Sequence, residues 1–350
     1  MTRPLPRPEL QSLTPYHSSE VAGGRIFLHA NENPYPPPQH VMDEIFERMR
    51  AVTLNRYPNP DPRELREKLA RYAGVDPSCV WIGDGSNEVL LQSCLAFGGP
   101  GRTALVFEPT YRMHYRQARM AGTEVSESKR TDEFEIDIDD AIATIEAAKP
   151  DIVFVCSPNN PTGTVTAVED IRRIADATQG LLIADEAYFE FCGLSLVPFI
   201  EQHANVIVAR TMSKAFRLAN VRLGYGIASP ELLDQLGRVT MPYAHSSFSE
   251  IAATVALSHS EELLGAVKAI VEQREKIEDR LGELPDIEVY EGGANFVFFT
   301  HPRARDLLDG LAAQGIVIRD FTHLVDGALR VTAGTPDETD EFLEVLTGLL

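Results

Sequence analysis

The chain has 350 residues, enough for one large domain or two modest ones, and 44% of them are hydrophobic. With 24 glycines and 23 prolines, this composition is typical of a globular protein and excludes collagen-like and wholly disordered chains. The 32 Lys and Arg residues against 52 Asp and Glu give a net charge of −20, which argues against a nucleic-acid partner and an anionic membrane surface. Any anionic ligand must therefore be bound by local positive groups.

Nothing in the sequence predicts a membrane segment or a metal site. No apolar run approaches the roughly 18 residues that a membrane helix needs, and the N-terminus lacks the apolar core of a signal peptide. The four cysteines, at positions 79, 94, 156 and 192, are widely spaced and form no CxxC pair. We expect a soluble cytoplasmic protein without disulfides and without a bound metal.

The pattern of apolar residues predicts the elements in chain order. The first 38 residues show no regular pattern, and HANENPYPPP at 29–38 is so rich in proline that it predicts an extended arm or a linker. From about residue 80, short apolar runs alternate with helix-like stretches, which predicts crossover units and a mostly parallel sheet. The predicted strands lie at 80–82, 103–107, 152–156, 181–185 and 206–210, and the helices between them lie at 86–97, 111–121, 138–148 and 167–178.

After about residue 248 the pattern changes to that of a smaller α+β domain. It predicts one long helix over 249–283 and a helix over 303–313, with strands near 287–290, 295–299, 316–318 and 329–332. The sequence Thr335-Pro336-Asp337-Glu338 predicts a capping box at the start of a last helix, 336–349. We expect an arm at 1–38, a large domain at 39–245 and a small domain at 246–350.

Polar side chains follow three successive strands of the predicted sheet. The third run leads to Asn160, the fourth ends in Asp185 with Tyr188 just beyond, and the fifth leads to Lys214 with Arg222 eight residues further on. Each alone is also typical of a turn, a helix cap or a solvated loop. Together they bring an amide, a carboxylate, a phenol and an amine to one edge of the sheet, where ligands of such folds bind. This set suits pyridoxal phosphate, whose aldehyde condenses with lysine and whose ring nitrogen needs a carboxylate.

The phosphate of such a cofactor needs a cradle of backbone amides and positive charge. The sequence GDGSNE at 83–88 follows the first predicted strand and opens a predicted helix. Its glycines allow a close backbone approach, and a helix N-terminus offers free N–H groups to an anion. Arg222 can add a bidentate contact.

Ordered motifs of one family extend over nearly the whole chain. They are LTPY at 13–16, ANENPY at 30–35, NRYP at 55–58, GDGSNE at 83–88, EPTYRMHY at 108–115, SPNNPTG at 157–163, DEAY at 185–188, TMSKAFRLANVRLGY at 211–225, ANFVF at 294–298, IVIRD at 316–320 and LRVTAGT at 329–335. On these motifs the chain resembles the fold-type I, class I/II pyridoxal-phosphate aminotransferases, and among them the branch that acts on histidinol phosphate. The resemblance implies an α/β large domain with a mostly parallel seven-stranded sheet, plus a smaller α+β domain.

The resemblance also implies roles for the residues at the cofactor. Lys214 is expected to hold pyridoxal phosphate as an internal aldimine and to move the proton of the substrate's α-carbon. Asp185 is expected to pair with the pyridinium nitrogen, while Asn160 and Tyr188 donate hydrogen bonds to the ring oxygen. The remaining cofactor-binding positions implied by the family are Gly85, Ser86, Asn87, Tyr111, which stacks on the ring, Thr211, Ser213, Arg222 and Tyr57, which reaches across a homodimer.

On the substrate side, the resemblance implies an anion clamp. Arg330 matches the arginine that binds carboxylates in the wider family, and Arg319, Tyr16 and Asn160 complete the expected substrate site. The implied reaction is histidinol phosphate plus 2-oxoglutarate to imidazole acetol phosphate plus glutamate, in a ping-pong mechanism. The small-molecule donor and acceptor would share the two arginines.

Two features leave alternatives open. Asn87 stands where the family often has Asp, and Tyr243 and His245 occupy a stretch where the family commonly has PYN. An aromatic amino acid aminotransferase is the first alternative, because a pocket lined by tyrosines suits a phenyl ring. A pyridoxal-phosphate-dependent decarboxylase of amino acid phosphates is the second. A non-catalytic homologue is disfavoured by the presence of Lys214 and by the acidic charge, which opposes DNA.

Overall fold

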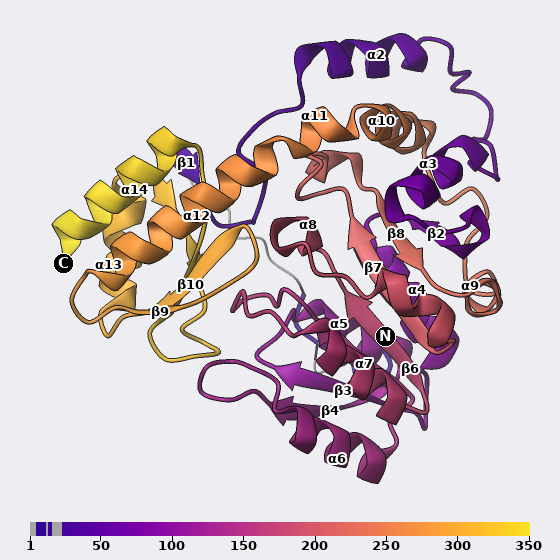
Figure 1. Ribbon diagram of the computed structural model, residues 1–350, viewed down its shortest axis with the longest axis horizontal. Coiled ribbons are helices and arrows are strands. Elements are labelled where there is room, and N and C mark those ends of the chain that lie inside the picture. The colour runs from indigo at the N-terminus through magenta and orange to yellow at the C-terminus, as the bar shows by residue number, and fades with distance from the viewer. Residues whose placement is uncertain (1–4, 12, 16–22) are drawn as a thin grey trace, which may run out of the picture.

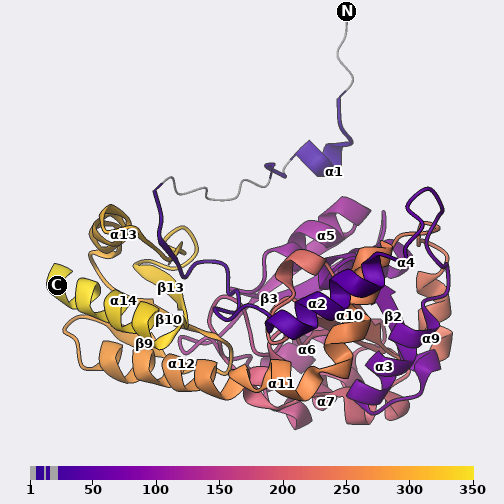
Figure 2. The ribbon, with the colours of Figure 1, turned by 90° about the horizontal axis from the view of Figure 1, so that it is seen from above.

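The protein is described by a computed structural model, in which residues 5–11, 13–15 and 23–350 are placed (Figure 1). A seven-stranded sheet with helices on both faces occupies one side of the molecule, and a smaller four-stranded sheet with its own helices occupies the other. Figure 2 shows the same two parts from above. No helix among these residues is long and apolar enough to cross a membrane.

The seven-stranded sheet has the order β2-β8-β7-β6-β5-β3-β4. Six strands run in one direction, and β8 alone is antiparallel to its neighbours. The prediction of a mostly parallel seven-stranded sheet is confirmed. Its strands are β2 (Val80–Gly83), β3 (Thr103–Glu108), β4 (Glu124–Lys129), β5 (Ile152–Cys156), β6 (Leu181–Asp185), β7 (Val206–Thr211) and β8 (Gly224–Ile227).

Helices cover both faces of this sheet because its central strands carry apolar side chains on both sides. In β5, Val153 and Val155 belong to one core, while Ile152 and Phe154 belong to the other. The first core is closed by α2 (Gln39–Met49), α3 (Arg63–Ala73), α6 (Ile138–Ala148), α7 (Val168–Ala177) and α10 (Ser247–Ser258). The second is closed by α4 (Ser86–Phe97), α5 (Met113–Ala121) and α9 (Pro230–Leu236).

The smaller sheet is antiparallel, in the order β12-β13-β10-β9. Beside it, β1 from the N-terminal arm pairs in parallel with β11, so the arm adds Ile26 and Leu28 to the core of this part. The elements are β1 (Ile26–Phe27), β9 (Glu288–Tyr290), β10 (Phe296–Thr300), β11 (Ile316–Val317), β12 (Arg319–Asp320), β13 (Ala328–Thr332), α12 (Ala266–Gly282), α13 (Ala304–Ala313) and α14 (Pro336–Leu349). The predicted capping box of α14 is confirmed: the Thr335 and Glu338 side chains each bind the other's backbone N–H.

The single helix expected over 249–283 is wrong. The structure has three helices there, α10, α11 (Ser260–Leu264) and α12. His259 leaves the helical region, with φ −112° and ψ 24°, and Gly265 separates α11 from α12. The breaks let α10 pack against α2 and α3 while α12 packs against α14 and the small sheet.

Several elements were not predicted at all. These are α2, α3, α9, β1, β4, β8 and β12, together with the short elements α1 (Pro8–Gln11), α8 (Phe189–Cys192), η1 (Pro77–Cys79), η2 (Val197–Gln202) and η3 (Ala219–Val221). The domain boundaries at 38/39 and 245/246 stay a prediction.

Candidate active site

The carboxyl ends of the central parallel strands bring the predicted residues together. Asn160 follows β5, and its Nδ2 donates a hydrogen bond to the Tyr188 hydroxyl at 3.3 Å. Asn31, from the N-terminal arm, donates to the same hydroxyl at 2.9 Å. On its other side, Asn160 Oδ1 accepts a bond of 2.5 Å from Arg330 Nη1. The site therefore joins the large sheet, the arm and the small sheet.

Asp185 ends β6 and is buried, and its carboxylate has two partners. Oδ1 accepts a bond of 3.1 Å from the Ala187 N–H, and Oδ2 lies 2.9 Å from His114 Nε2. His114 is fully buried on α5, where its ring stacks on Phe154 with centroids 4.8 Å apart. A buried carboxylate held by hydrogen bonds in this way is fixed in position.

Lys214 lies beyond the end of β7, within the loop that leads to β8. Its Nζ donates a bond of 2.9 Å to the carbonyl of Ala30, and its own carbonyl accepts a bond of 3.2 Å from Asn33 Nδ2. Removal of water from the ammonium lowers the pKa of Lys214 to about 8, and the positive charges of Arg330 and Arg222 act in the same direction. A lysine with this pKa has a neutral, nucleophilic fraction near neutral pH.

Backbone N–H groups and polar side chains gather at the N-terminus of α4. Gly85 caps this helix with φ +75° and no side-chain bond, so the first N–H groups of α4 lack an intrahelical partner. A Cβ at Gly85 would lie 2.7 Å from Arg222 Nη2, and one at Gly224 would lie 2.1 Å from the Ser86 nitrogen. Close approach to the backbone therefore requires a glycine at 224, and the positive φ favours one at 85. Around this point lie Ser213, whose hydroxyl contacts both Thr211 and Arg222, and Asn87, which accepts from the Tyr111 hydroxyl at 3.3 Å.

Arg319 and Arg330 stand directly opposite each other in the register of β12 and β13. Arg330 is buried, donates to the His29 carbonyl at 2.8 Å and lies between the rings of Phe296 and Phe321. Burial lowers the pKa of His29, and both arginines lower it further. Two guanidinium groups thus concentrate positive charge at the same end of the site as Asn160.

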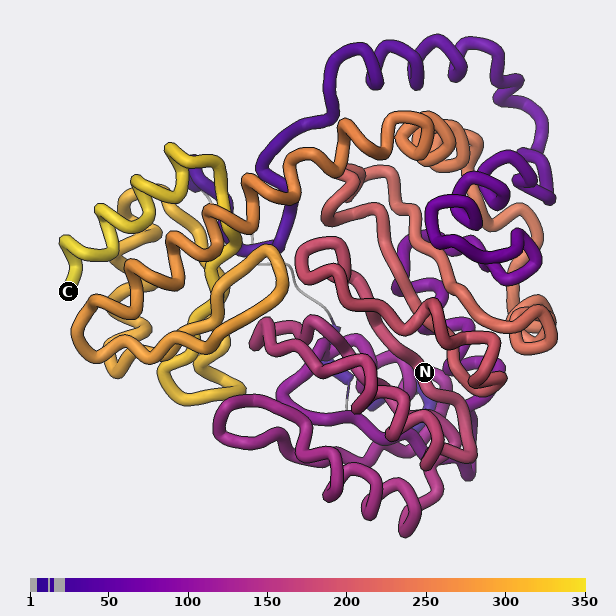
Figure 3. The backbone as a smooth tube through the Cα atoms, in the orientation of Figure 1, coloured from indigo at the N-terminus to yellow at the C-terminus, as the bar shows by residue number. Residues whose placement is uncertain are grey.

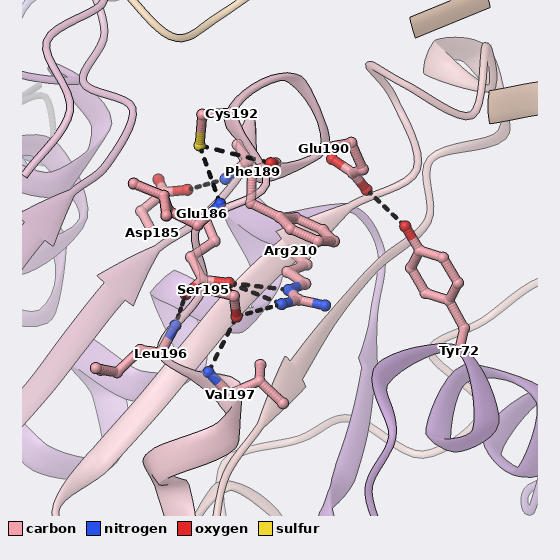
Figure 4. Close-up of polar contacts among 12 residues, drawn as sticks. Tyr72, Asp185, Glu186, Phe189, Glu190, Cys192, Ser195, Leu196, Val197 and Arg210 are labelled. Carbon is pink, nitrogen blue, oxygen red and sulfur yellow. Dashed lines mark hydrogen bonds and ion pairs between the residues drawn. The ribbon is translucent and has the colours of Figure 1, made fainter. Parts of the chain in front are cut away.

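A second polar network lies behind the strand ends (Figure 4). Arg210 and Glu186, both buried, form an ion pair in which Glu186 Oε2 accepts bonds of 3.0 and 2.9 Å. Ser195 binds both partners, and the Leu196 N–H completes the shell of Glu186. Because Glu186 follows Asp185 and Arg210 precedes Thr211, this pair joins the ends of β6 and β7 on the side away from the site.

Some predicted residues lie elsewhere. Tyr57 is 79% exposed and stacks on Tyr243, with ring centroids 4.5 Å apart. His245 lies near Asp84 and Glu88 at the start of α4, and burial lowers its pKa. Tyr16 falls outside the residues that the structure describes.

Three site residues escaped the sequence prediction: Asn31, His29 and His114. Asn31 and His29 belong to HANENPYPPP, which was interpreted as an arm, and His114 belongs to EPTYRMHY, of which only Tyr111 was given a role. Their position within family motifs was the signal in the sequence that could have revealed these residues. The sequence alone does not show that the arm and α5 approach the strand ends.

Comparison with known proteins defines the class. Residues 25–346 match the family model of aminotransferase class I and II. The chain belongs to this family, whose members are pyridoxal-phosphate-dependent aminotransferases. The family, fold, enzyme class and cofactor predicted from the motifs are thus confirmed.

Several similar proteins within this family are histidinol-phosphate aminotransferases. The histidinol-phosphate aminotransferase of Mycobacterium ulcerans is 41% identical, with 97% of this chain and 93% of that protein covered. That of Corynebacterium glutamicum is 42% identical, with 93% and 91% covered. The crystal structure of histidinol-phosphate aminotransferase from Sinorhizobium meliloti in complex with pyridoxal-5'-phosphate shares the fold, with a TM-score of 0.89, 24% identity, and 98% and 96% covered. The enzyme from Clostridium acetobutylicum gives 0.86 at 25% identity, with 93% and 99% covered.

Proposed function

We propose that the protein transfers the amino group of L-histidinol phosphate to 2-oxoglutarate, giving imidazole acetol phosphate and L-glutamate in histidine biosynthesis. The observation that carries this proposal is the pair Arg319 and Arg330 beside Asn160, which offers a second anion site apart from that at α4. Relatives that are 41–42% identical over most of their length and act on histidinol phosphate support it.

The residues at the strand ends fit pyridoxal phosphate. The uncapped N-terminus of α4, with Ser86, Asn87, Thr211, Ser213 and Arg222, would hold a phosphate, because N–H groups, hydroxyls and a guanidinium converge there. No side chain at Gly85 or Gly224 blocks this cradle. At the other end, Asp185, Asn160, Tyr188 and Tyr111 would hold the ring.

Each side chain at the ring would do a distinct task. When bound, pyridoxal phosphate supplies an aldehyde that condenses with amines and a ring that accepts electrons from the substrate's α-carbon. Asp185, held by His114, would keep a proton on the ring nitrogen. Tyr188 and Asn160 would donate hydrogen bonds to the ring oxygen. Lys214 Nζ, with its lowered pKa, would accept the proton of the substrate's α-carbon.

The arginine pair would set the substrate. Arg330 is pre-oriented by its bonds to Asn160 and His29, so binding an anion would cost it little side-chain freedom. A phosphate dianion uses more donors than one guanidinium offers, and Arg319 lies opposite to add them. The carboxylates of glutamate and 2-oxoglutarate would use the same pair in the second half of a ping-pong cycle.

A homodimer with shared sites is part of the proposal. Leu54, Tyr57 and Met241 are 86%, 79% and 72% exposed, a set of large apolar side chains that a second copy would cover. Tyr57 would then reach the phosphate of the partner's cofactor. Mixing inactive Lys214→Ala subunits with Tyr57→Ala subunits should restore activity, because mixed dimers contain one intact site. Absence of any recovery in verified mixed dimers would contradict shared sites. The cytoplasmic location stays a prediction.

Steady-state product analysis tests the reaction. The enzyme is incubated with 2-oxoglutarate and either histidinol phosphate or phenylalanine, and separately with O-phosphothreonine, an amino acid phosphate that has a carboxylate to lose. Glutamate and carbon dioxide are measured in each reaction. We expect glutamate from histidinol phosphate, little from phenylalanine, and no carbon dioxide. A preference for phenylalanine would favour an aromatic aminotransferase, and release of carbon dioxide would favour a decarboxylase.

A further inference from the structure

The chain passes between the two sheets at two segments within residues 23–350. One leads from β1 to α2, and the other leads from α10 through α11 into α12, beside it in Figures 1 and 3. Arg217, in the Lys214 loop, ties them together, because its side chain donates bonds of 3.1 Å to the carbonyls of both Pro36 and Leu263. The two crossings therefore form one connected structure next to the active-site loop.

A group of metal-ligand side chains lies at this point, outside the Lys214 site. His40 begins α2, and its Nε2 lies 3.0 Å from Oε2 of Glu262 on α11. His259 lies at the break between α10 and α11, and its ring centroid is 5.3 Å from that of His40. One ligand atom from each of His40, His259 and Glu262 lies within 4.8 Å of the other two.

We propose that His40, His259 and Glu262 form a binding site for a divalent transition metal of the zinc type, which links the two crossing segments. Two imidazoles and one carboxylate are a common three-residue ligand set for Zn²⁺, with a water in the fourth position. Imidazole nitrogen also disfavours Mg²⁺ and Ca²⁺, which prefer oxygen ligands. Ligand atoms of a tetrahedral zinc site lie about 3.3 Å apart at bonds of about 2.05 Å, so small side-chain rotations complete the geometry.

Glu44 is a further carboxylate that contacts His259, and an ion pair between His40 and Glu262 alone would not require it. Its Oε2 lies 2.9 Å from His259 Nε2. Metal-binding histidines commonly have such a carboxylate, which orients the ring and raises its basicity. Arg48 holds Glu44 in turn, at 3.0 Å. The four side chains come from two distant parts of the sequence, so no spacing motif reveals them.

The solvent exposure of the three proposed ligand side chains also suits a metal site. The side chains of His40 and Glu262 are 56% and 50% exposed, and that of His259 is 28% exposed. An ion can thus enter from solvent without opening the fold, and it would join a helix of one crossing to the helix break of the other. Bound metal would stabilise the folded protein by linkage.

Calorimetric titration of the metal-free, full-length holoenzyme with zinc chloride tests this proposal. We expect one site per chain and a higher melting temperature with zinc. The double variant His40→Asn/His259→Asn should bind at least about 100-fold more weakly, and Glu44→Gln about 10-fold more weakly. His323→Gln is the matched control, since His323 is an exposed histidine of the small domain outside the ligand set, and it should bind as the wild type does.

Circular dichroism and cofactor absorbance check that each variant is folded. Glu262→Gln changes only a half-exposed carboxylate, so it tests the site even if the double variant does not fold. It should also lose zinc affinity. A wild-type protein that binds no zinc, or binding that survives unchanged in Glu262→Gln, would overturn the proposal.

Discussion

Replacing Arg330 with lysine should separate phosphate recognition from chemistry. Arg330 makes two charged hydrogen bonds, of 2.5 Å to Asn160 and 2.8 Å to the His29 carbonyl, and lies between two aromatic rings. Lysine keeps the charge but has a single point of donation in place of a planar fork. A charged hydrogen bond contributes roughly 1.5–3 kcal/mol, so loss of one in the transition state lowers kcat/KM about 10- to 150-fold.

The assay compares two substrates. The kcat/KM for histidinol phosphate should fall by this factor in Arg330→Lys, whereas that for histidinol, which has no phosphate, should change less than about threefold. Arg319→Lys, at a half-exposed position, should show a smaller loss. Equal losses for both substrates would mean that Arg330 acts through the shape of the site, and no loss would refute the anion clamp.

Three further predictions concern the groups behind the site. His114→Asn should weaken cofactor binding about tenfold, because Asp185 loses its buried partner; equilibrium dialysis of pyridoxal phosphate measures this, and unchanged affinity would contradict it. Arg210→Met should lower the free energy of unfolding by about 3–5 kcal/mol, because it leaves Glu186 buried without its partner; urea denaturation with a midpoint like the wild type's would refute the ion pair's importance. Burial raises the pKa of Glu190 to about 8, above the ordinary value that applies when unfolded. The protonated acid therefore stabilises the fold fully below about pH 4.5, and this contribution is lost as pH rises towards 8. Glu190→Gln should remove that pH dependence in melting curves, and identical slopes would count against it.

The sequence predicted the strands best where burial is complete. In β5 and β6 every residue is buried, and both strands have their predicted bounds, because uninterrupted β-branched and apolar runs between turn residues have few other solutions. The last helix also matched, since its capping box and proline define its start. Over 249–283 the apolar pattern continued through His259 and Gly265, so periodicity alone did not show the breaks that redirect the chain.

The site residues also divide into those that the sequence predicted and those that it did not. Asn160, Asp185 and Lys214 follow directly from strand ends of a parallel sheet, so topology alone brings them together. Asn31 and His114 reach the site from the arm and from α5, and their approach depends on tertiary packing that one sequence does not display. Tyr57 is exposed and stacks on Tyr243, and its proposed role depends on contact with a partner chain.

Single-turnover spectroscopy tests whether the amino group of histidinol phosphate is transferred to the cofactor and whether this transfer needs Lys214. The cofactor-loaded enzyme is mixed with histidinol phosphate without any oxo acid, and the cofactor absorbance is followed in the wild type and in Lys214→Ala. We expect rapid conversion to the pyridoxamine form in the wild type, reversed by 2-oxoglutarate, and almost none in Lys214→Ala. Conversion at the wild-type rate without Lys214, or none in the wild type with histidinol phosphate, would contradict this mechanism.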